Sequence, residues 1–545
     1  MNIQLFLIKF GEESNKPIKN LVLTSLTITL VYTICSTIYK KYAKGNDPWN
    51  RKGFKKIPSP PERYPYIGHM YSLGDSPSTK LDKWHVKHGP ILHLYMGIQH
   101  WIFVSDPVIA HELMTRHGSV TSDRSNHTFA FEMFSKNGSS KRYLSKAASG
   151  ISFNKYGKKW KDSRSAVLSI LSVPYFDAVA GTIESVADNA CGHLKKITEN
   201  EGSVDPLEYI QMATYHTMIK AVLGKDVRSI DDTVLKDIIW ITHKLLRYAS
   251  PEGDIESFLP KFSWFREQTQ LKKDMKSFVE LRDKVYTDLI KEAVANNTEC
   301  WITRAHARKS EYNLNDNDLI VIASDLVSGG GENPCTSLMW LFAALSQYPD
   351  IHKRVCAEID NFVTENGRIP NFLDRLDLPY TCALLKENLR FRNTSNFGIP
   401  HRVTKDIEAL GYFIPKDSLI VSSMHAMHMN SSVYNNPYEY MPERFLGHTK
   451  TWAAESYGKI DERFLFNFGW GRRICPGPYL AEMTIFIVAV RILAQFHIEP
   501  TVDVNGKPEF VDLNSFSNKG FTFAPTEYKV KFVPRSNNNL PKDSV

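Results

Sequence analysis

Apolar positions along the body of the chain recur mainly at helical spacing. The stretch PYLAEMTIFIVAVRILAQF (478–496) is long, periodic and almost uncharged, and it predicts a buried helix that starts near Gly477. A second stretch, IASDLVSGGGENPCTSLMWLFAALSQYP (322–349), predicts a long helix with a weakened middle. Its three consecutive glycines (329–331) and Pro334 together forgo about 6 kcal/mol of helix propensity. We expect either a kink over a bulky group or a break between two helices.

The N-terminal region contains an uncharged apolar segment, LVLTSLTITLVYTICSTIY (21–39). A helix of this length spans about 29 Å, close to the hydrocarbon thickness of a bilayer. No small-residue cleavage site is evident, and more lysines and arginines follow the segment than precede it. We therefore expect an uncleaved single-pass anchor whose body faces the cytosol. A cleaved signal peptide and an interfacial helix are the alternatives.

These patterns divide the chain into three parts. Residues 1–46 form the predicted membrane anchor, and residues 47–66 form a Pro-rich linker. Residues 67–545 contain no repeat, low-complexity block or second linker, so we expect them to form one catalytic domain.

Composition limits the partners and the compartment. The net charge of +8 comes from 67 basic and 59 acidic residues, without a long basic run that carries interleaved aromatics. This excludes nucleic acid as an expected partner and favours an acidic protein or an anionic membrane. The 7 cysteines are scattered and never spaced as C-x-x-C, which argues against a disulfide framework or a structural zinc site.

One cysteine has a special setting. Cys475 lies in FNFGWGRRICPGPYLAE (466–482), directly before the predicted helix, where free N–H groups favour a thiolate. Such a sulfur can act as a nucleophile or as a metal ligand, and an inert buried cysteine is the third possibility. Gly469, Gly471 and Gly477 would admit a bulky planar group, and Arg473 could reach an anionic substituent on it.

Five residues of this stretch match the pattern F-x-x-G-x-R-x-C-x-G at every fixed position: Phe468, Gly471, Arg473, Cys475 and Gly477. The chain thereby resembles the cytochrome P450 family, in particular its membrane-bound eukaryotic, fungal-type members, from about residue 57 onward. The resemblance implies a mainly α fold with a small β region, preceded by one transmembrane helix. It also implies haem b as cofactor, with Cys475 as the axial ligand of the iron.

Other matches support the resemblance. Glu387 and Arg390 stand one helical turn apart, and with Arg444 of a Pro-Glu-Arg-Phe stretch they are expected to form a buried network that supports the cysteine loop. The resemblance further implies that four residues contact the haem propionates: Trp160, Arg164, His401 and Arg402. Lys155, Lys158, Lys159 and Lys161 could form a docking face for a reductase or simply a solvated surface.

The weakened helix departs from the family pattern. Glu332 matches the family's acid, but Asn333 replaces the usual threonine, and Thr336 offers a displaced hydroxyl. An amide can hold a water but relays a proton less readily than a hydroxyl. We still expect Glu332 and Asn333 to serve catalysis.

A second departure concerns the substrate pocket. The sequence RNTSNFGIP places Asn393, Thr394, Ser395 and Asn396 where relatives commonly place apolar residues, which predicts a pocket of increased polarity. Six aromatic residues are its other expected lining: Phe129, Phe131, Phe134, Phe397, Phe521 and Phe523.

The resemblance implies a monooxygenase in the endoplasmic reticulum membrane. It would insert one atom of dioxygen into a hydrophobic small molecule, with electrons from NADPH through a separate NADPH–cytochrome P450 reductase and with cytochrome b5 as a further donor. The alternatives are a haem-thiolate isomerase or dehydratase that needs no reductase, and a non-catalytic haem- or ligand-binding protein on the same fold.

Overall fold

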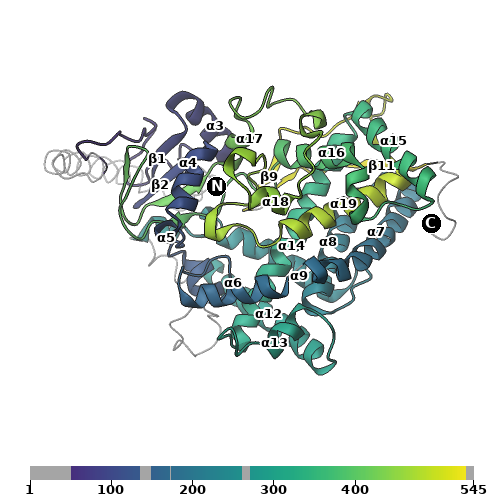
Figure 1. Ribbon diagram of the computed structural model, residues 1–545, viewed down its shortest axis with the longest axis horizontal. Coiled ribbons are helices and arrows are strands. Elements are labelled where there is room, and N and C mark those ends of the chain that lie inside the picture. Colours follow the sequence, from purple (N-terminus) through teal and green to yellow (C-terminus); the bar gives the residue numbers. More distant parts are fainter. Residues whose placement is uncertain are drawn as a thin grey trace, which may run out of the picture.

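Helices make up most of the computed structural model, and the strands form small sheets (Figure 1). The structure describes Trp49 and residues 51–135, 149–171, 173–260, 270–518 and 520–535. In Figure 1, β1 (Ile91–Met96) and β2 (Gln99–Val104) lie at one end of the molecule, and α7 (Val173–Glu201) and α15 (Pro349–Asn366) lie at the other. The expected mainly α fold with a small β region is confirmed.

The remaining α-helices follow in chain order: α3 (Pro77–His88), α4 (Pro107–His111), α5 (Gly118–Thr121), α6 (Lys158–Ile170), α8 (Leu207–Leu223), α9 (Thr233–Ala249), α10 (Ile255–Phe258), α12 (Gln270–Ala295), α13 (Trp301–Ala307), α14 (Asp316–Leu345), α16 (Pro379–Phe391), α17 (Met424–His428), α18 (Trp452–Ser456) and α19 (Pro478–Gln495). The short 3-10 and π-helical elements are η2 (Glu112–Arg116), η3 (Thr128–Ser135), η4 (Pro251–Gly253), η6 (Phe372–Asp377), η7 (Pro442–Phe445), η8 (Ile460–Glu462) and η9 (Gly471–Arg473).

The strands beyond β1 and β2 are short: β3 (His401–Arg402), β4 (Ile407–Ala409), β5 (Tyr412–Ile414), β6 (Leu419–Ser422), β7 (Phe496–Val502), β8 (Pro508–Glu509), β9 (Phe516–Asn518), β10 (Phe523–Pro525) and β11 (Val530–Pro534). The largest sheet has the order β1-β2-β6-β3, in which β2 and β6 run parallel and the other pairs antiparallel. A second sheet has the order β11-β7-β8, and β10-β9 and β4-β5 form separate pairs.

Helix α14 runs through the centre of the core and packs on α8 and α19. Asn315 caps its first turn and shares a capping box with Asp318. From Asp318 to Leu345 every residue is buried except Gly329, Gly330 and Asn333. The helix continues through Pro334 without a break, so one of the two sequence-based alternatives is wrong.

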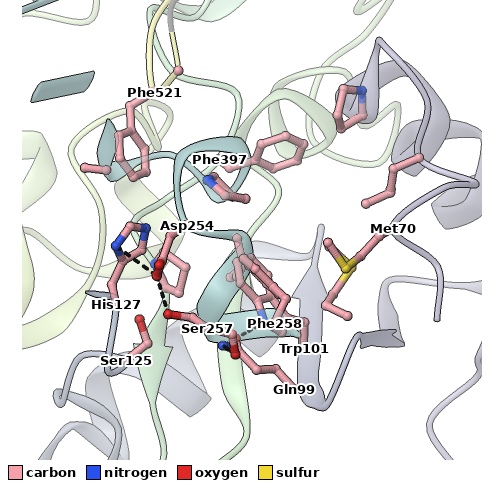
Figure 2. Close-up of a pocket in the computed structure, with 18 of the residues that line it drawn as sticks. Met70, Gln99, Trp101, Ser125, His127, Asp254, Ser257, Phe258, Phe397 and Phe521 are labelled. Carbon is pink, nitrogen blue, oxygen red and sulfur yellow. Dashed lines mark hydrogen bonds and ion pairs between the residues drawn. The ribbon is translucent and has the colours of Figure 1, made fainter. Parts of the chain in front are cut away.

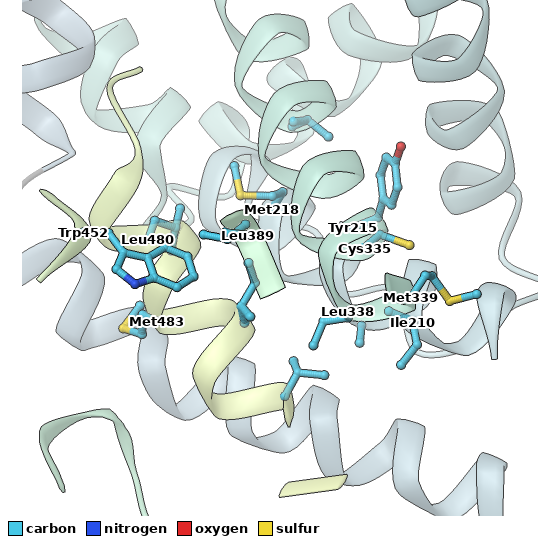
Figure 3. Packing of buried hydrophobic residues seen from close by; sticks show 14 of the residues in the cluster. Ile210, Tyr215, Met218, Cys335, Leu338, Met339, Leu389, Trp452, Leu480 and Met483 are labelled. Atoms are coloured by element: carbon cyan, nitrogen blue, oxygen red, sulfur yellow. The ribbon is translucent and has the colours of Figure 1, made fainter. Parts of the chain in front are cut away.

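The glycines of α14 serve the close approach of α8. A Cβ on Gly330 would lie 2.5 Å from the sulfur of Met218, and a Cβ on Gly331 would lie 2.7 Å from the Tyr215 ring. Figure 3 shows both side chains beside the helix that carries Cys335. A Cβ on Gly329, in contrast, would meet no atom within 4 Å. Two of the three glycines are therefore explained by helix packing, and the third leaves open space on one face.

The proposed anchor (21–39) lies outside the described residues, and so does most of the segment before residue 57. Among the described helices, one is long and apolar enough to cross a bilayer: α19, which is mostly buried in the protein. The Pro-rich segment follows the sheet edge, because His93 N–H donates to Pro58 O at 2.8 Å and Lys55 N–H donates to Gly411 O at 2.7 Å. The domain boundaries stay predictions.

Candidate functional site

The cysteine loop is held by a small set of hydrogen bonds ahead of α19. The N–H of Cys475 donates to Phe468 O at 2.7 Å, and the hydroxyl of Tyr457 donates to Cys475 O at 2.9 Å. The N–H of Gly477, the residue that precedes α19, points at the sulfur from 3.3 Å. The helix thus starts where the sequence predicts, with the sulfur at its N-terminus.

The surroundings of the sulfur act on its pKa in opposite directions. Burial raises the pKa of the Cys475 thiol, while the Gly477 N–H and the charge of Arg164 lower it. Burial dominates, which differs from the expectation that the helix terminus alone would favour a thiolate. A metal cation at the sulfur would reverse this balance, because a coordinating thiol loses its proton.

The glycines of the cysteine loop are required for different structural reasons. Gly469 and Gly471 have φ values of 77° and 55°, in the region that side chains rarely adopt. A Cβ on Gly471 would also lie 2.2 Å from the carbonyl oxygen of Met114 in η2, so this glycine lets two backbone segments touch. A Cβ on Gly477 would meet nothing within 4 Å. Open space beside the sulfur is thus found at Gly477, whereas Gly471 serves backbone packing.

A group of cations converges on residues 151–154, next to this loop. Arg473 donates to Ile151 O at 3.2 Å and to Asn154 O at 2.6 Å, and Arg124 donates to Ser152 O at 3.0 Å. The indole N–H of Trp160 also donates to Ile151 O, at 3.0 Å.

The ring of Trp160 lies near two guanidinium groups. It is 4.2 Å from the Cζ of Arg473 and 5.9 Å from that of Arg164. Arg164 in turn donates to the carbonyl of Ile474, the neighbour of Cys475. The structure therefore brings together Trp160, Arg164 and Arg473, which the sequence nominated from distant segments.

The positive charges of Arg124, Arg164 and Arg473 lie close together in a region with little exposure to solvent. Burial and the charges of Arg124 and Arg164 lower the pKa of Arg473 to about 8, and burial lowers that of Arg124 to about 9. Burial also lowers the pKa of Arg164. Within the described part of the chain none of these guanidinium groups lies at ion-pair distance from a carboxylate. Asp123, which pairs with Arg402 at 3.0 Å, is the nearby carboxylate whose charge raises the pKa of Arg124 and Arg473. Buried like charges of this kind call for an anion.

The side chains of His401 and Arg402 point in opposite directions, because successive strand residues face opposite sides of a sheet. His401 is buried, its Nδ1 lies 3.0 Å from Thr121 O, and burial together with the charges of Arg124 and Arg473 holds its pKa well below the ordinary value. Arg402 instead pairs with Asp123 and Asp417. The structure places His401 with the cation group and directs Arg402 away from it.

Haem b fits these residues. It presents two carboxylate groups on one edge of a flat ring, and the unpaired cations Arg124, Arg164 and Arg473 supply the matching charge. The sulfur of Cys475 is a donor that haem iron accepts, and Gly477 leaves space beside it. Sequence reasoning missed Arg124, because the loop sequence TSDRSN has no periodic signal that would single it out.

The acid of α14 is turned toward α8 and α9. The hydroxyl of Tyr215 donates to Glu332 Oε2 at 2.8 Å, and His243 Nε2 lies 3.4 Å from the same oxygen. Asn333 is only partly buried, on the open face with Gly329, and its amide donates to Gly329 O at 3.0 Å. Thr336 is buried in the helix packing.

Glu387, Arg390 and Arg444 meet in one buried network. The Nε of Arg390 donates to Glu387 Oε2 at 2.6 Å, and its Nη2 donates to Oε1 at 2.8 Å. The Nε of Arg444 lies 3.1 Å from the same carboxylate, and the N–H of Met441 donates to it at 2.8 Å. Neither side chain of the Glu387–Arg390 pair is exposed to solvent, so every charge depends on its partners.

A cavity of about 580 Å³ opens between the β1–β2 sheet, residues 124–131, the segment from Ala249 to Leu259 and the C-terminal hairpin (Figure 2). Four of the expected aromatics line it: Phe131, Phe397, Phe521 and Phe523. Phe129 and Phe134 do not, because they are buried and pack on Phe278 and on Arg282, respectively. Arg124 belongs to both the cavity wall and the cation group.

The expected polar stretch does not face the cavity. The side chains of Asn393 and Asn396 bond within the protein, to Asn467 Nδ2 at 2.8 Å and to Ser78 Oγ at 3.1 Å. The hydroxyl of Ser395 donates to Phe521 O at 2.8 Å. None of the four polar residues at 393–396 is among the residues that line this cavity, so they do not add to its polarity.

Sequence reasoning missed another polar corner of the cavity. His127 Nδ1 lies 3.1 Å from Asp254 Oδ2, and the hydroxyl of Ser257 donates to the same oxygen (Figure 2). Thr128 N–H donates to it as well, at 2.9 Å. The carboxylate stands between serine and imidazole, so it cannot orient the imidazole as a base for the serine. It fastens residues 127–128 to the segment around α10.

Comparisons with known proteins agree with this site. The family model for cytochrome P450 matches residues 58–532. The chain is 27% identical to cytochrome P450 monooxygenase 58 of Postia placenta over 495 residues, which covers 88% of this chain and 89% of that protein. It is 27% identical over 514 residues to cytochrome P450 monooxygenase verL of Clonostachys rogersoniana (90% and 89%), and 26% identical over 479 residues to mouse cytochrome P450 2F2 (86% and 92%).

Among solved structures, a zebrafish cytochrome P450 with abiraterone shares the fold at a TM-score of 0.68 and 22% identity, covering 85% of this chain and 99% of that one. The family match spans nearly the whole body, and it confirms the resemblance drawn from the cysteine loop. The chain therefore belongs to the cytochrome P450 family and is an oxidoreductase of the monooxygenase class.

Proposed function

We propose that this protein is a haem-thiolate monooxygenase that inserts one atom of dioxygen into a hydrophobic small molecule, using electrons from NADPH through a separate reductase. The observation that carries this proposal is the group of Arg124, Arg164 and Arg473 beside the Cys475 loop, which has no carboxylate at ion-pair distance among the described residues. It supplies a place for two carboxylates next to a thiol, and an apolar cavity shares one wall with it.

Haem supplies, when bound, the redox chemistry that activates dioxygen; the chain supplies its setting. Arg124, Arg164 and Arg473 would hold the propionates, and the Gly477 N–H, which points at the sulfur of Cys475, would stabilise a negative charge there. The open face of α14 at Gly329 and Asn333 faces the reacting site. The aromatic wall of the cavity excludes water from the substrate.

Glu332 serves as the proton-holding group. It is buried, it accepts a hydrogen bond from Tyr215, and its other neighbour His243 is about one-third exposed. His243 thereby joins the buried carboxylate to solvent. The amide of Asn333, which is bonded to Gly329 O, holds a water where relatives have a hydroxyl.

The reductase and the location are part of the proposal. We place the protein in the endoplasmic reticulum membrane, with NADPH–cytochrome P450 reductase as electron donor and cytochrome b5 as a second donor. The uncharged apolar segment at 21–39 supports a membrane location. The lysines of α6 contribute less free charge than their number suggests, because Lys159 pairs with Asp318 and Lys158 pairs with Asp162.

The replacement at Asn333 favours a second candidate: an isomerase or dehydratase that acts on an activated substrate without a reductase. A carbon monoxide experiment separates the two. The haem-loaded protein is reduced with NADPH and purified reductase under carbon monoxide, and in parallel with dithionite. A red-shifted thiolate-type band in both samples supports the monooxygenase, whereas a band with dithionite alone supports the second candidate.

Two serine variants complete the experiment. Cys475→Ser should abolish the red-shifted band, while Cys382→Ser, at a half-buried cysteine outside the loop, should keep it. Persistence of the band in Cys475→Ser would show that another residue ligates the iron.

A further inference from the structure

Two histidines and a cysteine meet at a place outside the Cys475 loop. His352 and Cys356 come from α15, and His497 comes from β7. Their ligand atoms, one imidazole nitrogen from each histidine and the cysteine sulfur, all lie within 4.8 Å of one another.

The fold explains this meeting. His352 and Cys356 are four residues apart in α15, which places them on one face of the helix. The side chain of His497 points outward from β7, because Phe496 and Ile498 on either side of it are buried. Antiparallel pairing of His497 with Val533 of β11 fixes its position along the strand.

The cluster has the character of a binding site more than of a packed core. His352 and Cys356 are only 6% and 3% exposed, yet Nε2 of His352 has no hydrogen-bond partner among the described residues. Cys356 makes one weak contact, to Leu493 O at 3.8 Å. Buried polar atoms in native proteins are almost always partnered, by protein, water or an ion.

The charges around the cluster also suit a cation. The carboxylates of Asp360 and Glu499 both act on His497, against the single guanidinium of Arg535. Two carboxylates therefore lie near the cluster, and one of them, Asp360, is already paired with Arg535. His497 is exposed, which gives an ion a path from solvent.

We propose that His352, Cys356 and His497 bind a divalent ion of the zinc class, with water as the fourth ligand. Two imidazole nitrogens and one thiolate are a ligand set that zinc accepts, at bond lengths of about 2.0–2.3 Å. Those lengths put tetrahedral ligands about 3.4–3.6 Å apart, so the side chains need to close by about 1 Å. The exposed side chain of His497 can supply this movement.

The ion would fasten α15 to β7 and would be separate from the haem iron. The absence of C-x-x-C spacing, which argues against a zinc site built from cysteines, does not bear on this cluster. This site uses a single cysteine and takes its third ligand from a strand more than 140 residues away along the chain.

Zinc titration of the full-length, haem-loaded protein tests the proposal, after dialysis against a chelator. We expect one tightly bound zinc per chain. X-ray absorption at the zinc edge, which the haem iron does not disturb, should show one sulfur and two imidazole nitrogens around the metal.

His497→Gln should weaken zinc binding by at least about 100-fold, since even changes in outer-shell partners weaken metal sites by 10- to 100-fold. Cys356→Ser should remove the sulfur signal from the absorption spectrum. Cys382→Ser serves as the matched control and should keep both the zinc affinity and the sulfur signal. Because His497 is exposed, its replacement leaves the fold intact even if Cys356→Ser fails to fold. Absence of tight zinc, a shell without sulfur, or unchanged affinity in His497→Gln would each overturn the proposal.

Discussion

Replacing the glycines of α14 one at a time tests how this helix is packed. Gly329→Ala adds a methyl group where no atom lies within 4 Å, so it should stabilise the helix by about 1 kcal/mol through propensity alone. Gly331→Ala gains the same propensity but places its methyl carbon 2.7 Å from the ring of Tyr215. That ring is fully buried, and its hydroxyl is bonded to Glu332, so it cannot swing aside freely.

Forcing a methyl group into such a place costs about 1–3 kcal/mol. Because the propensity gain is common to both variants, it cancels from their difference. Gly331→Ala should therefore be less stable than Gly329→Ala by about 1–3 kcal/mol. Gly330→Ala should fall between them, since its methyl meets the flexible side chain of Met218.

The assay is urea unfolding of the haem-loaded proteins, followed by far-ultraviolet circular dichroism, with haem absorbance per chain recorded alongside. Equal midpoints for Gly329→Ala and Gly331→Ala would refute the reasoning, because the approach of Tyr215 would then not be what requires a glycine. Loss of haem in Gly329→Ala alone would show directly that the open face of α14 borders the cofactor.

Three further outcomes are expected. Glu387→Gln should lower the free energy of unfolding in urea by about 3–5 kcal/mol, because it leaves two buried guanidinium groups without their carboxylate. Replacement of the half-exposed Glu443 by glutamine should change the free energy of unfolding by less than about 1 kcal/mol. Equal effects of the two variants would contradict a buried network. Burial raises the pKa of Glu482 from 4.5 to about 7, so the folded protein keeps a proton that the unfolded chain releases, and stability should fall by about 3 kcal/mol as the pH rises from 4.5 to 7. Glu482→Gln should remove that slope from the urea midpoints, and an unchanged slope would assign it to other groups. Arg473→Gln should speed haem transfer to apomyoglobin by about 10- to 100-fold, while the exposed Arg472→Gln should leave the rate unchanged; equal rates would remove Arg473 from the propionate site.

The sequence was most informative where chemistry imposes a local pattern. The cysteine loop predicted its own family, and the apolar run behind it predicted α19 to within a residue. The pair Glu387 and Arg390 could be named because a helix sets their spacing, and a buried charge needs a partner wherever it lies.

The sequence was least informative where function depends on how loops meet. Arg124 has no pattern of its own, and it joins the cation group only because residues 151–154 pass beside it. Phe129 and Phe134 differ from Phe131 in which side of a π-helical turn they occupy, which spacing did not reveal. Arg402 was misjudged for a similar reason: alternation along β3 sends it to the opposite face from His401.

The packing of the cysteine loop has a consequence for how the protein is made. Arg473 bonds to the carbonyl of Ser122, which lies 351 residues earlier in the chain, and Gly471 rests on Met114. At a synthesis rate of about 10 residues per second, the early segment waits roughly half a minute for its partner to leave the ribosome. During that interval the segment around residue 124 lacks the loop that packs against it. On the proposed assignment of the haem site, haem insertion is a late event in biogenesis, and we expect truncated chains that stop before residue 471 to expose this region to aggregation and proteolysis.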